Sequence, residues 1–260
     1  MHSVKELKQL KTKKGRDESG LFIIEGEKFV QEIPSNWNVT QYVIANRYAT
    51  AHDISLYESR ANCTIVRDSI FDSLADTVSP QGILAVCEQK IFTLSNLLDR
   101  HIAPHFILLG ENLNDPGNIG ALVRTAAAAG ADGVMLTAGS GDIYNPKVLR
   151  AAAGAVLRLP IVTNADLAQT ISLLCNKNIP IYAAHPRGEK SPYELDLRNN
   201  FCLLVGNESH GISETAAGLA QALVMLPMAN NTESLNASIA GSILMYEAVR
   251  QRQMGGKIEC

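Results

Sequence analysis

Short apolar runs recur through the first 90 positions and alternate with stretches of helical spacing. The runs are rich in β-branched residues and predict strands at 21–24, 42–45, 64–66 and 83–86. A short helix is expected over 27–33, ended by Pro34, and another after Asp68, whose side chain suits an N-cap. Strands that alternate with helices at this spacing predict a small α/β unit.

A second alternation begins at His105. Its apolar runs predict strands at 106–109, 133–136, 159–162, 179–183, 201–205 and 223–226. Helices are expected between and after them, at 119–129, 146–153, 165–175 and 235–251. Continuous apolar strands between helices are typical of a parallel sheet covered on both faces. The pattern weakens from residue 89 to 104, so we expect a linker there and two domains, 1–96 and 97–260.

Composition narrows the class of protein. A content of 46% hydrophobic residues argues against long disorder, and a formal net charge of −3 argues against a generally basic nucleic-acid binder. The five cysteines are dispersed without a C-x-x-C pair, which favours reduced thiols over a disulfide framework. No apolar run reaches the roughly 18 residues of a membrane span, and the N-terminus lacks a signal-peptide core. These features predict a soluble, cytoplasmic protein.

Three loops that follow predicted strands carry polar residues and glycines that core packing does not require. They cover residues 110–120, 206–213 and 227–236. Ligands of open α/β sheets bind outside the carboxyl ends of the strands, so the loops predict one composite pocket.

Common nucleotide and hydrolase motifs are absent from these loops. The sequence contains no G-x-G-x-x-G fingerprint, no G-x-x-x-x-G-K-[ST] loop and no G-x-S-x-G elbow. It also lacks a cluster of His, Cys and Asp with zinc-ligand spacing, so no metal is implied.

Taken together, the loops resemble the three motifs of the SpoU (TrmH) family of RNA ribose 2′-O-methyltransferases. The first motif is matched by residues 114–120 with 124–126, the second by 206–208 with 211–213, and the third by 226–228 with 233–236. Residues 22–27 and 80–82 resemble the family's N-terminal substrate-binding domain. The resemblance covers nearly the whole chain.

The resemblance implies an α/β catalytic domain with a C-terminal trefoil knot, preceded by a smaller RNA-binding domain. It implies S-adenosylmethionine as cofactor, RNA as substrate, with ribosomal RNA favoured over transfer RNA and both left open, and a homodimer formed through the C-terminal domain. The implied catalytic residues are Asn118, Arg124, Glu208, Ser234 and Asn236. The implied cofactor-binding residues are Thr137, Ala138, Gly206, Asn207, Leu226, Met228 and Leu235.

Each implied catalytic residue also has a purely structural interpretation. Arg124 is assigned by the resemblance to activation of the 2′-hydroxyl, but arginine stays protonated, so we favour a bidentate grip on the adjacent phosphate. Glu208 is interpreted as orienting Arg124 or a substrate hydroxyl, or else as a solvated loop acid. Asn118 and Ser234 lie where helix N-caps are expected, and His210 is interpreted as a surface histidine.

The sequence departs from the family in the third loop. Asn230 and Asn231 stand where glycine is usual, and Ala237 replaces a valine. Asparagine adopts the left-handed conformation more readily than other non-glycine residues, so we expect the turn to persist.

The first sixteen residues carry a local charge of +5, from six cations against Glu6. The cations are Lys5, Lys8, Lys11, Lys13, Lys14 and Arg16. Alone, such a run is typical of a solvated, partly helical terminus. Beside an RNA-binding domain it predicts an arm that contacts phosphates.

Two other functions stay open at this point. One is a non-catalytic RNA-binding or assembly module on the same scaffold, which the complete set of motif residues argues against. The other is an α/β enzyme that acts on a small molecule. For dimerisation, the sequence offers the apolar stripe of Ile239, Ile243, Leu244 and Tyr246 on the last helix, which core packing would explain equally well.

Overall fold

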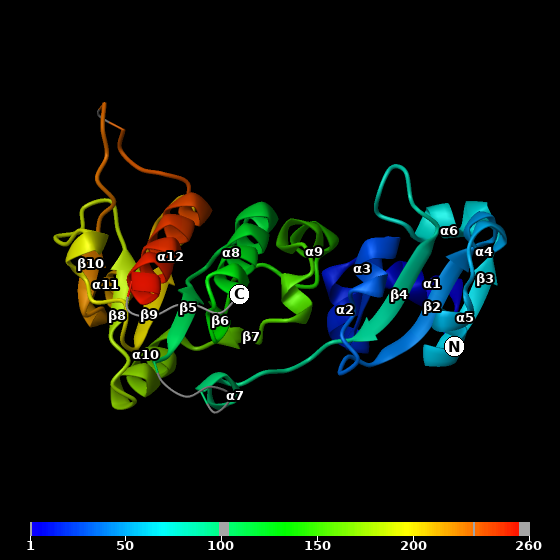
Figure 1. Cartoon of the computed structure of the whole chain (residues 1–260), viewed down its shortest axis with the longest axis horizontal. Helices are drawn as coiled ribbons and strands as arrows, with labels where there is room; N and C mark the ends of the chain where they lie inside the picture. Colours follow the sequence, from blue (N-terminus) through cyan, green and yellow to red (C-terminus); the bar gives the residue numbers. More distant parts are fainter. Residues whose placement is uncertain (1, 99–103, 231, 255–260) are drawn as a thin grey trace. The chain divides into compact units, whose positions relative to one another are not determined.

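The computed structural model describes residues 2–98, 104–230 and 232–254. The chain forms two compact units. The first contains the residues up to Lys90 and the segment Asp142–Leu157, and the second contains Ile91–Gly141 and the residues from Arg158 onward (Figure 1). The functional division predicted between residues 96 and 97 stays a prediction. Residues 142–157 group with the first unit because most of their contacts are with residues of that unit.

The first unit contains a four-stranded mixed sheet in the order β1-β4-β2-β3. Strands β1 (Leu21–Glu25), β2 (Val39–Ala45), β3 (Asn62–Val66) and β4 (Ile83–Glu88) confirm the four predicted strands. Only β2 and β3 pair in parallel. The helices are α1 (Val4–Gln9), α2 (Lys13–Ser19), α3 (Glu27–Gln31), α4 (Asn46–Ala51), α5 (Ser55–Arg60), α6 (Asp68–Leu74) and α9 (Pro146–Ala152), followed by the 3₁₀ turn Ala155–Leu157.

Apolar residues of α1 and α6 pack on one face of this sheet, where Leu7, Phe71 and Leu74 contact strand residues such as Val43 and Leu84. The segment 142–157 is fixed to the unit by polar contacts as well. A guanidinium nitrogen of Arg16 lies 2.6 Å from Asp142 Oδ2. The indole of Trp37 donates a hydrogen bond to the Leu157 carbonyl, at 2.7 Å.

The second unit contains a six-stranded parallel sheet in the order β10-β8-β9-β5-β6-β7, as the continuous apolar runs predicted. The strands are β5 (Phe106–Gly110), β6 (Gly133–Thr137), β7 (Ile161–Ala165), β8 (Ile181–Ala184), β9 (Phe201–Val205) and β10 (Ala222–Val224). The helices are α7 (Leu94–Leu98), α8 (Pro116–Ala128), α10 (Leu167–Asn176), α11 (Glu214–Leu219) and α12 (Ala237–Met254), with a 3₁₀ turn at Pro192–Glu194.

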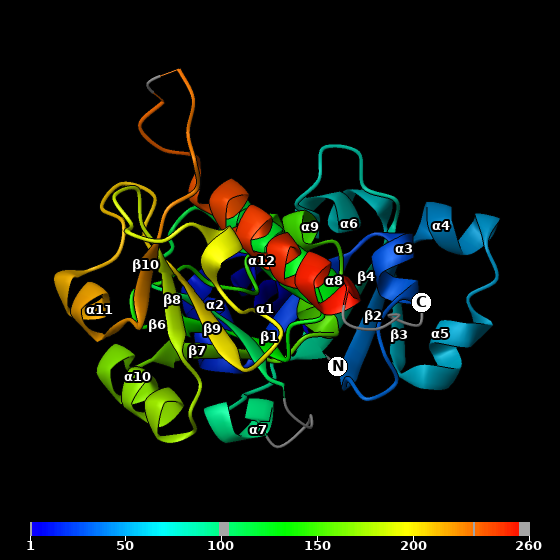
Figure 2. The ribbon, with the colours of Figure 1, turned by 60° about the vertical axis from the view of Figure 1, so that its left-hand side comes forward.

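Helices cover both faces of this sheet. Buried residues of α7, α10 and α11 join one apolar cluster with alternate residues of the strands, among them Ile107, Leu109 and Leu204. On the other face, α8 and α12 lie side by side (Figures 1 and 2). The hydroxyls of Ser242 on α12 and Thr125 on α8 are 3.0 Å apart.

The structure corrects four local predictions. Asp68 is the first residue of α6 and Arg67 holds the N-cap position, while the Asp68 carboxylate accepts the Arg47 amide. Asn118 does not precede its helix, because α8 begins at Pro116 and Asp115 is the N-cap. The last helix begins two residues later than expected, and α7 lies inside the predicted linker.

None of the helices in the described part of the chain has the length and apolar character needed to cross a bilayer. Within the same residues, no group of His, Cys, Asp and Glu side chains is arranged to hold a metal ion.

Candidate functional site

The three polar loops leave the carboxyl ends of β5, β9 and β10 in the second unit. Strands β5 and β9 are neighbours, and β10 follows β8 at the edge beside them. Because all six strands are parallel, these ends meet at one edge of the sheet, where ligands of such folds bind.

The first and second loops are joined by direct hydrogen bonds. The Asn207 amide donates to the Asn112 carbonyl at 2.7 Å. The Glu208 carboxylate accepts the backbone N–H groups of Asn114 and Asp115, at 3.4 and 3.2 Å. A carboxylate at the start of α8 is also stabilised by the positive end of the helix dipole. Glu208 therefore organises the first loop. Among the described residues its bonds go to this loop and not to Arg124.

Neutral side chains connect the first loop to the third. Asn118 donates through Nδ2 to Glu208 at 3.1 Å, and its Oδ1 accepts the Asn236 amide at 2.9 Å and the Ser238 hydroxyl at 3.1 Å. The Asn236 Oδ1 in turn accepts the backbone N–H groups of Ser238 and Ile239 at the start of α12. Asn118 and Ser238 are buried, so the centre of this network is shielded from water, whereas Glu208 and Asn236 are exposed.

Gly206 lets the second loop turn sharply as it leaves β9. A Cβ at this position would lie 2.3 Å from the Gly211 carbonyl carbon, closer than real Cβ contacts allow. The backbones of Asn207 and Gly211 exchange two hydrogen bonds of 2.9 Å, which close the loop on itself. Only glycine permits this approach of two backbones.

A cavity of about 310 Å³ lies between the second and third loops, within the size range of small-ligand sites. Five of the seven predicted cofactor-binding residues line it, together with the predicted catalytic residues Glu208 and Ser234. The five are Gly206, Asn207, Leu226, Met228 and Leu235. Loop backbone alternates there with apolar side chains such as Leu244. This lining fits S-adenosylmethionine, because backbone groups can read its adenine and amino-acid ends and apolar groups can cover its rings.

The structure places the other two predicted cofactor residues elsewhere. Thr137 and Ala138 do not line this cavity. The Thr137 side chain is buried at the end of β6, where its hydroxyl accepts the Asn112 amide at 3.0 Å. Through this hydrogen bond, Thr137 holds the backbone of the first loop at Asn112.

Sequence reasoning missed two contributions to the site. Residues 185–187, which follow β8, line the cavity beside the second loop. The position of β8 between β9 and β10 brings them there, and sheet order was not visible in the sequence. Ser238 was missed as well, although its place two residues after Asn236 in the third motif offered a signal.

Arg124 lies on the exposed surface of α8, six residues beyond Asn118 and hence about 9 Å further along the helix axis. It does not line the cavity. In the described part of the chain its guanidinium has no hydrogen bond or ion pair, so all five N–H donors face solvent. His210 is exposed too, and its backbone N–H donates to Asn207 Oδ1.

The third loop keeps its turn despite the missing glycine. Asn230 adopts the left-handed conformation with a φ of 55°, as its residue type predicted. The second departure from the family, Asn231, lies outside the described residues.

The six N-terminal cations are not equivalent. Arg16 is buried and bonded to Asp142 and to the Leu10 carbonyl, so its prediction as an RNA contact is wrong. Lys11 donates to the carbonyls of Ser73 and Ala75 at the end of α6. The remaining four are exposed on α1 and α2, and two of these pair within the helix, Lys13 with Asp17 and Lys14 with Glu18.

Comparison with known proteins agrees with this arrangement. Residues 105–246 match the SpoU rRNA Methylase family, and residues 2–85 match the MRM3-like substrate binding domain. The chain is 31% identical to the 23S rRNA (guanosine(2553)-2′-O)-methyltransferase RlmP of Bacillus subtilis (strain 168), over 94% of both chains. It is 34% identical to the 23S rRNA (guanosine-2′-O-)-methyltransferase RlmB of Xylella fastidiosa (strain Temecula1), over 73% of this chain and 78% of the relative.

The fold agrees with a crystal structure of an AdoMet-bound rRNA methyltransferase from Sinorhizobium meliloti. The TM-score is 0.84 at 29% identity, over 95% of this chain and 94% of the other. The two family matches together span both units, and a relative aligns along almost the whole length of the chain. The chain belongs to the SpoU rRNA methylase family.

Proposed function

We propose that this protein transfers a methyl group from S-adenosylmethionine to a ribose 2′-hydroxyl of ribosomal RNA. The observation that carries the proposal is that the second and third motif loops line one cavity, while the first motif loop is joined to both through the network of Glu208, Asn118 and Asn236. The names of the relatives RlmP and RlmB, both 23S rRNA 2′-O-methyltransferases, favour ribosomal over transfer RNA.

Different residues of the chain bind the cofactor and hold the loops in position. The loop backbone around Gly206, with Leu226 and Leu235, would hold the cofactor. When bound, the cofactor supplies an activated methyl group on a sulfonium ion. Glu208, Asn118, Asn236 and Ser238 keep the loops in place, and alignment of this kind can contribute roughly 7–11 kcal/mol to a transfer reaction.

Arg124 serves as the phosphate clamp in this proposal. Its exposed guanidinium remains protonated and can grip a phosphate through two parallel hydrogen bonds. A phosphate fixed beside the target ribose would orient the 2′-hydroxyl. Ser234, exposed at the cavity, is placed to contact RNA or the amino-acid end of the cofactor.

The first unit supplies further RNA contacts. It matches a substrate-binding domain, and its exposed cations Lys5, Lys8, Lys13 and Lys14 form the phosphate-contacting surface. Removal of these charges should reduce RNA affinity and its salt dependence, because each cation that neutralises a phosphate releases counterions.

The trefoil knot, the homodimer and the cytoplasmic location stay predictions within this proposal. For the dimer, Ile239, Ile243 and Tyr246 on α12 are 41–52% exposed and form the contact surface, whereas Leu244 is buried in the core. Sedimentation of the wild type and of Ile243→Glu tests it: we expect a dimer that the charge disrupts.

A labelling assay tests the function. Purified protein, tritiated S-adenosylmethionine and total RNA should yield label in ribosomal RNA, and Arg124→Ala should reduce it at least tenfold. Arg198→Ala, an exposed arginine of the same unit bonded to Asp196, is the matched control and should not change the rate. If the wild type labels no RNA and binds no S-adenosylmethionine but binds RNA tightly, a non-catalytic RNA-binding module is the correct function.

A further inference from the structure

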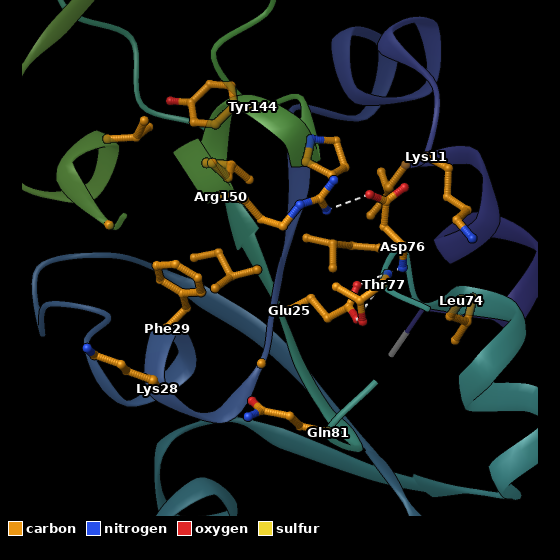
Figure 3. Close-up of a pocket in the computed structure, with 18 of the residues that line it drawn as sticks. Lys11, Glu25, Lys28, Phe29, Leu74, Asp76, Thr77, Gln81, Tyr144 and Arg150 are labelled. Carbon is orange, nitrogen blue, oxygen red and sulfur yellow. Dashed lines mark hydrogen bonds and ion pairs between the residues drawn. The ribbon is translucent and has the colours of Figure 1, made fainter. Parts of the chain in front are cut away.

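The first unit contains a second enclosed space, unrelated to the cofactor cavity. It measures about 350 Å³ and is lined by residues of β1, α3, the loop 76–81 and α9 (Figure 3). All of these elements belong to the first unit. The volume lies in the range of small-ligand sites, so the pocket has room for one compact chemical group.

The walls are mainly apolar. Ile23, Leu149 and Val156 line the pocket, and the half-buried ring of Phe29 faces it from α3. The other aromatic side chain, Tyr144, is buried and packs against the ring of Phe22, at 4.3 Å between centroids. Phe29 therefore offers the free aromatic face, and a flat ring is the ligand shape that such a face stabilises.

The two acidic groups at the pocket are already occupied. The Glu25 carboxylate accepts the Asp76 amide at 2.6 Å and also binds the Thr77 hydroxyl. Asp76 accepts Arg150 Nη1 at 2.5 Å (Figure 3). Both carboxylates therefore repel an anionic ligand less strongly than a carboxylate without partners would.

The cations keep spare donors. Lys28 is exposed and has no hydrogen bond or ion pair among the residues that the structure describes. Lys11 uses two carbonyl acceptors and retains its full charge, and Arg150 gives only Nη1 to Asp76. With three cations against two carboxylates, the lining carries a charge of +1, which suits an anionic group at the mouth.

Gln81 adds a fixed polar group. Its Oε1 accepts the Glu27 amide at 2.7 Å, which orients the side chain and leaves the two N–H donors of Nε2 for a ligand. An apolar space with an aromatic wall, oriented amide donors and cations at the rim combines the features that bind a base and its phosphate.

We propose that this pocket binds one unpaired nucleotide of the RNA substrate. The base stacks on Phe29 and is read by Gln81, and the phosphate contacts Lys28, while Lys11 and Arg150, elsewhere on the lining, add positive charge (Figure 3). The proposal rests on the function proposed above and adds a second, non-reacting contact site. A paired base cannot enter, because only a base taken out of the stack exposes its face to an aromatic side chain.

A fluorescent base tests the proposal on the full-length protein. The probe is a single-stranded RNA dodecamer with one central 2-aminopurine, whose fluorescence falls when the base stacks. We expect quenching by the wild type. Leu149→Trp, which fills the pocket without removing a charge, should abolish it and weaken binding by about fivefold or more. Leu173→Trp, on the exposed face of α10, is the matched control and should behave as wild type.

A charge variant tests the phosphate contact separately. Lys28→Ala should weaken binding of the dodecamer several-fold more than Lys177→Ala, an exposed lysine of the second unit. Thermal melting shows that the variants are folded. Equal quenching by Leu149→Trp and Leu173→Trp, or binding by the wild type without quenching, would overturn the proposal. Equal effects of the two lysine variants would overturn its phosphate contact.

The methylation assay separates this proposal from the proposed function. If the wild type methylates ribosomal RNA and Leu149→Trp leaves KM unchanged, the pocket proposal fails alone. If the wild type methylates no RNA, the proposed function fails, and the quenching comparison still decides whether the pocket holds a base.

Discussion

The cofactor cavity of the second unit and the pocket of the first unit differ in the groups that organise their surroundings. Backbone and neutral side chains organise the cofactor cavity of the second unit. The side-chain amides of Asn118 and Asn236 connect the first and third loops, and the backbones of Gly206 and Gly211 approach closely within the second loop. Ion pairs organise the first unit, where Arg16 binds Asp142 and Arg150 binds Asp76. A backbone-built site has little tolerance for added atoms, whereas a charged site depends on partners, salt and pH.

The largest expected effect on stability is in the first unit. Arg16→Ala leaves the Asp142 carboxylate buried without its partner, and breaking such a pair costs about 3–5 kcal/mol. We expect the first unit of this variant to unfold at a lower urea concentration than in the wild type, while the affinity for S-adenosylmethionine stays unchanged. Lys5→Ala, an exposed cation of the same segment, should change the free energy of unfolding by less than about 0.5 kcal/mol. Equal stability of both variants would mean that the ion pair does not hold the unit.

In the second unit, one added methyl group should be enough to damage the cofactor cavity. Gly206→Ala places a Cβ 2.3 Å from the Gly211 backbone, and such overpacking costs about 1–3 kcal/mol. Calorimetry should show S-adenosylmethionine affinity reduced by roughly 5- to 150-fold. Gly218→Ala in α11, where the new Cβ meets nothing within 4 Å, should bind the cofactor like the wild type. Undiminished binding by Gly206→Ala would show that the close approach is not required.

The hydrogen-bond network of Asn118, Asn236 and Ser238 should weaken when the Asn118 side chain is removed. Asn118→Ala removes the acceptor of the Asn236 side-chain amide and one of the two acceptors of the Ser238 hydroxyl, which still donates to Asn236 Oδ1; each lost bond costs about 0.5–1.5 kcal/mol. Thermal unfolding should show a lower Tm, and methyl transfer should fall because the loops lose their connection. Asn176→Ala, exposed on α10, is the control. Wild-type stability and activity in Asn118→Ala would contradict a joining role for this side chain.

A further effect is a pH dependence confined to the first unit. Burial raises the pKa of Tyr144 to about 12, from an unfolded value of 10.0. Because the folded state favours the protonated phenol, its contribution is complete below pH 10 and is lost as pH rises toward 12, by on the order of 2–3 kcal/mol. The stability difference between wild type and Tyr144→Phe should therefore favour the wild type at pH 9 and shrink or reverse at pH 11.5. A constant difference would show that the phenol titrates normally.

The sequence was sufficient for the sheets and for most of the cavity. Apolar runs such as 201–205 are buried on both sheet faces, so pattern alone identified them. The motif residues Gly206, Leu226 and Leu235 do meet in one place, because parallel strands bring their carboxyl ends together. These features depend on local sequence and on a general rule of sheet geometry.

What the sequence did not reveal depends on distant partners. Arg16 reads as one more cation of a basic segment, and only Asp142, 126 positions away, explains its burial. The role of Thr137 as a cofactor contact stays a prediction, and its hydroxyl accepts the backbone N–H of Asn112, a partner that the sequence did not indicate. Similarly, residues 142–157 group with the first unit and supply part of the wall of the pocket at Phe29. No sequence motif predicted this pocket.

The most direct test of the central claim is a map of 2′-O-methylated riboses in ribosomal RNA from cells with and without this chain. We expect one ribosomal position to lose its methyl group when the chain is absent. The wild-type chain should restore the mark, and Gly206→Ala should restore it poorly. Identical maps in the two kinds of cell would contradict the assignment of this protein as a ribosomal RNA methyltransferase.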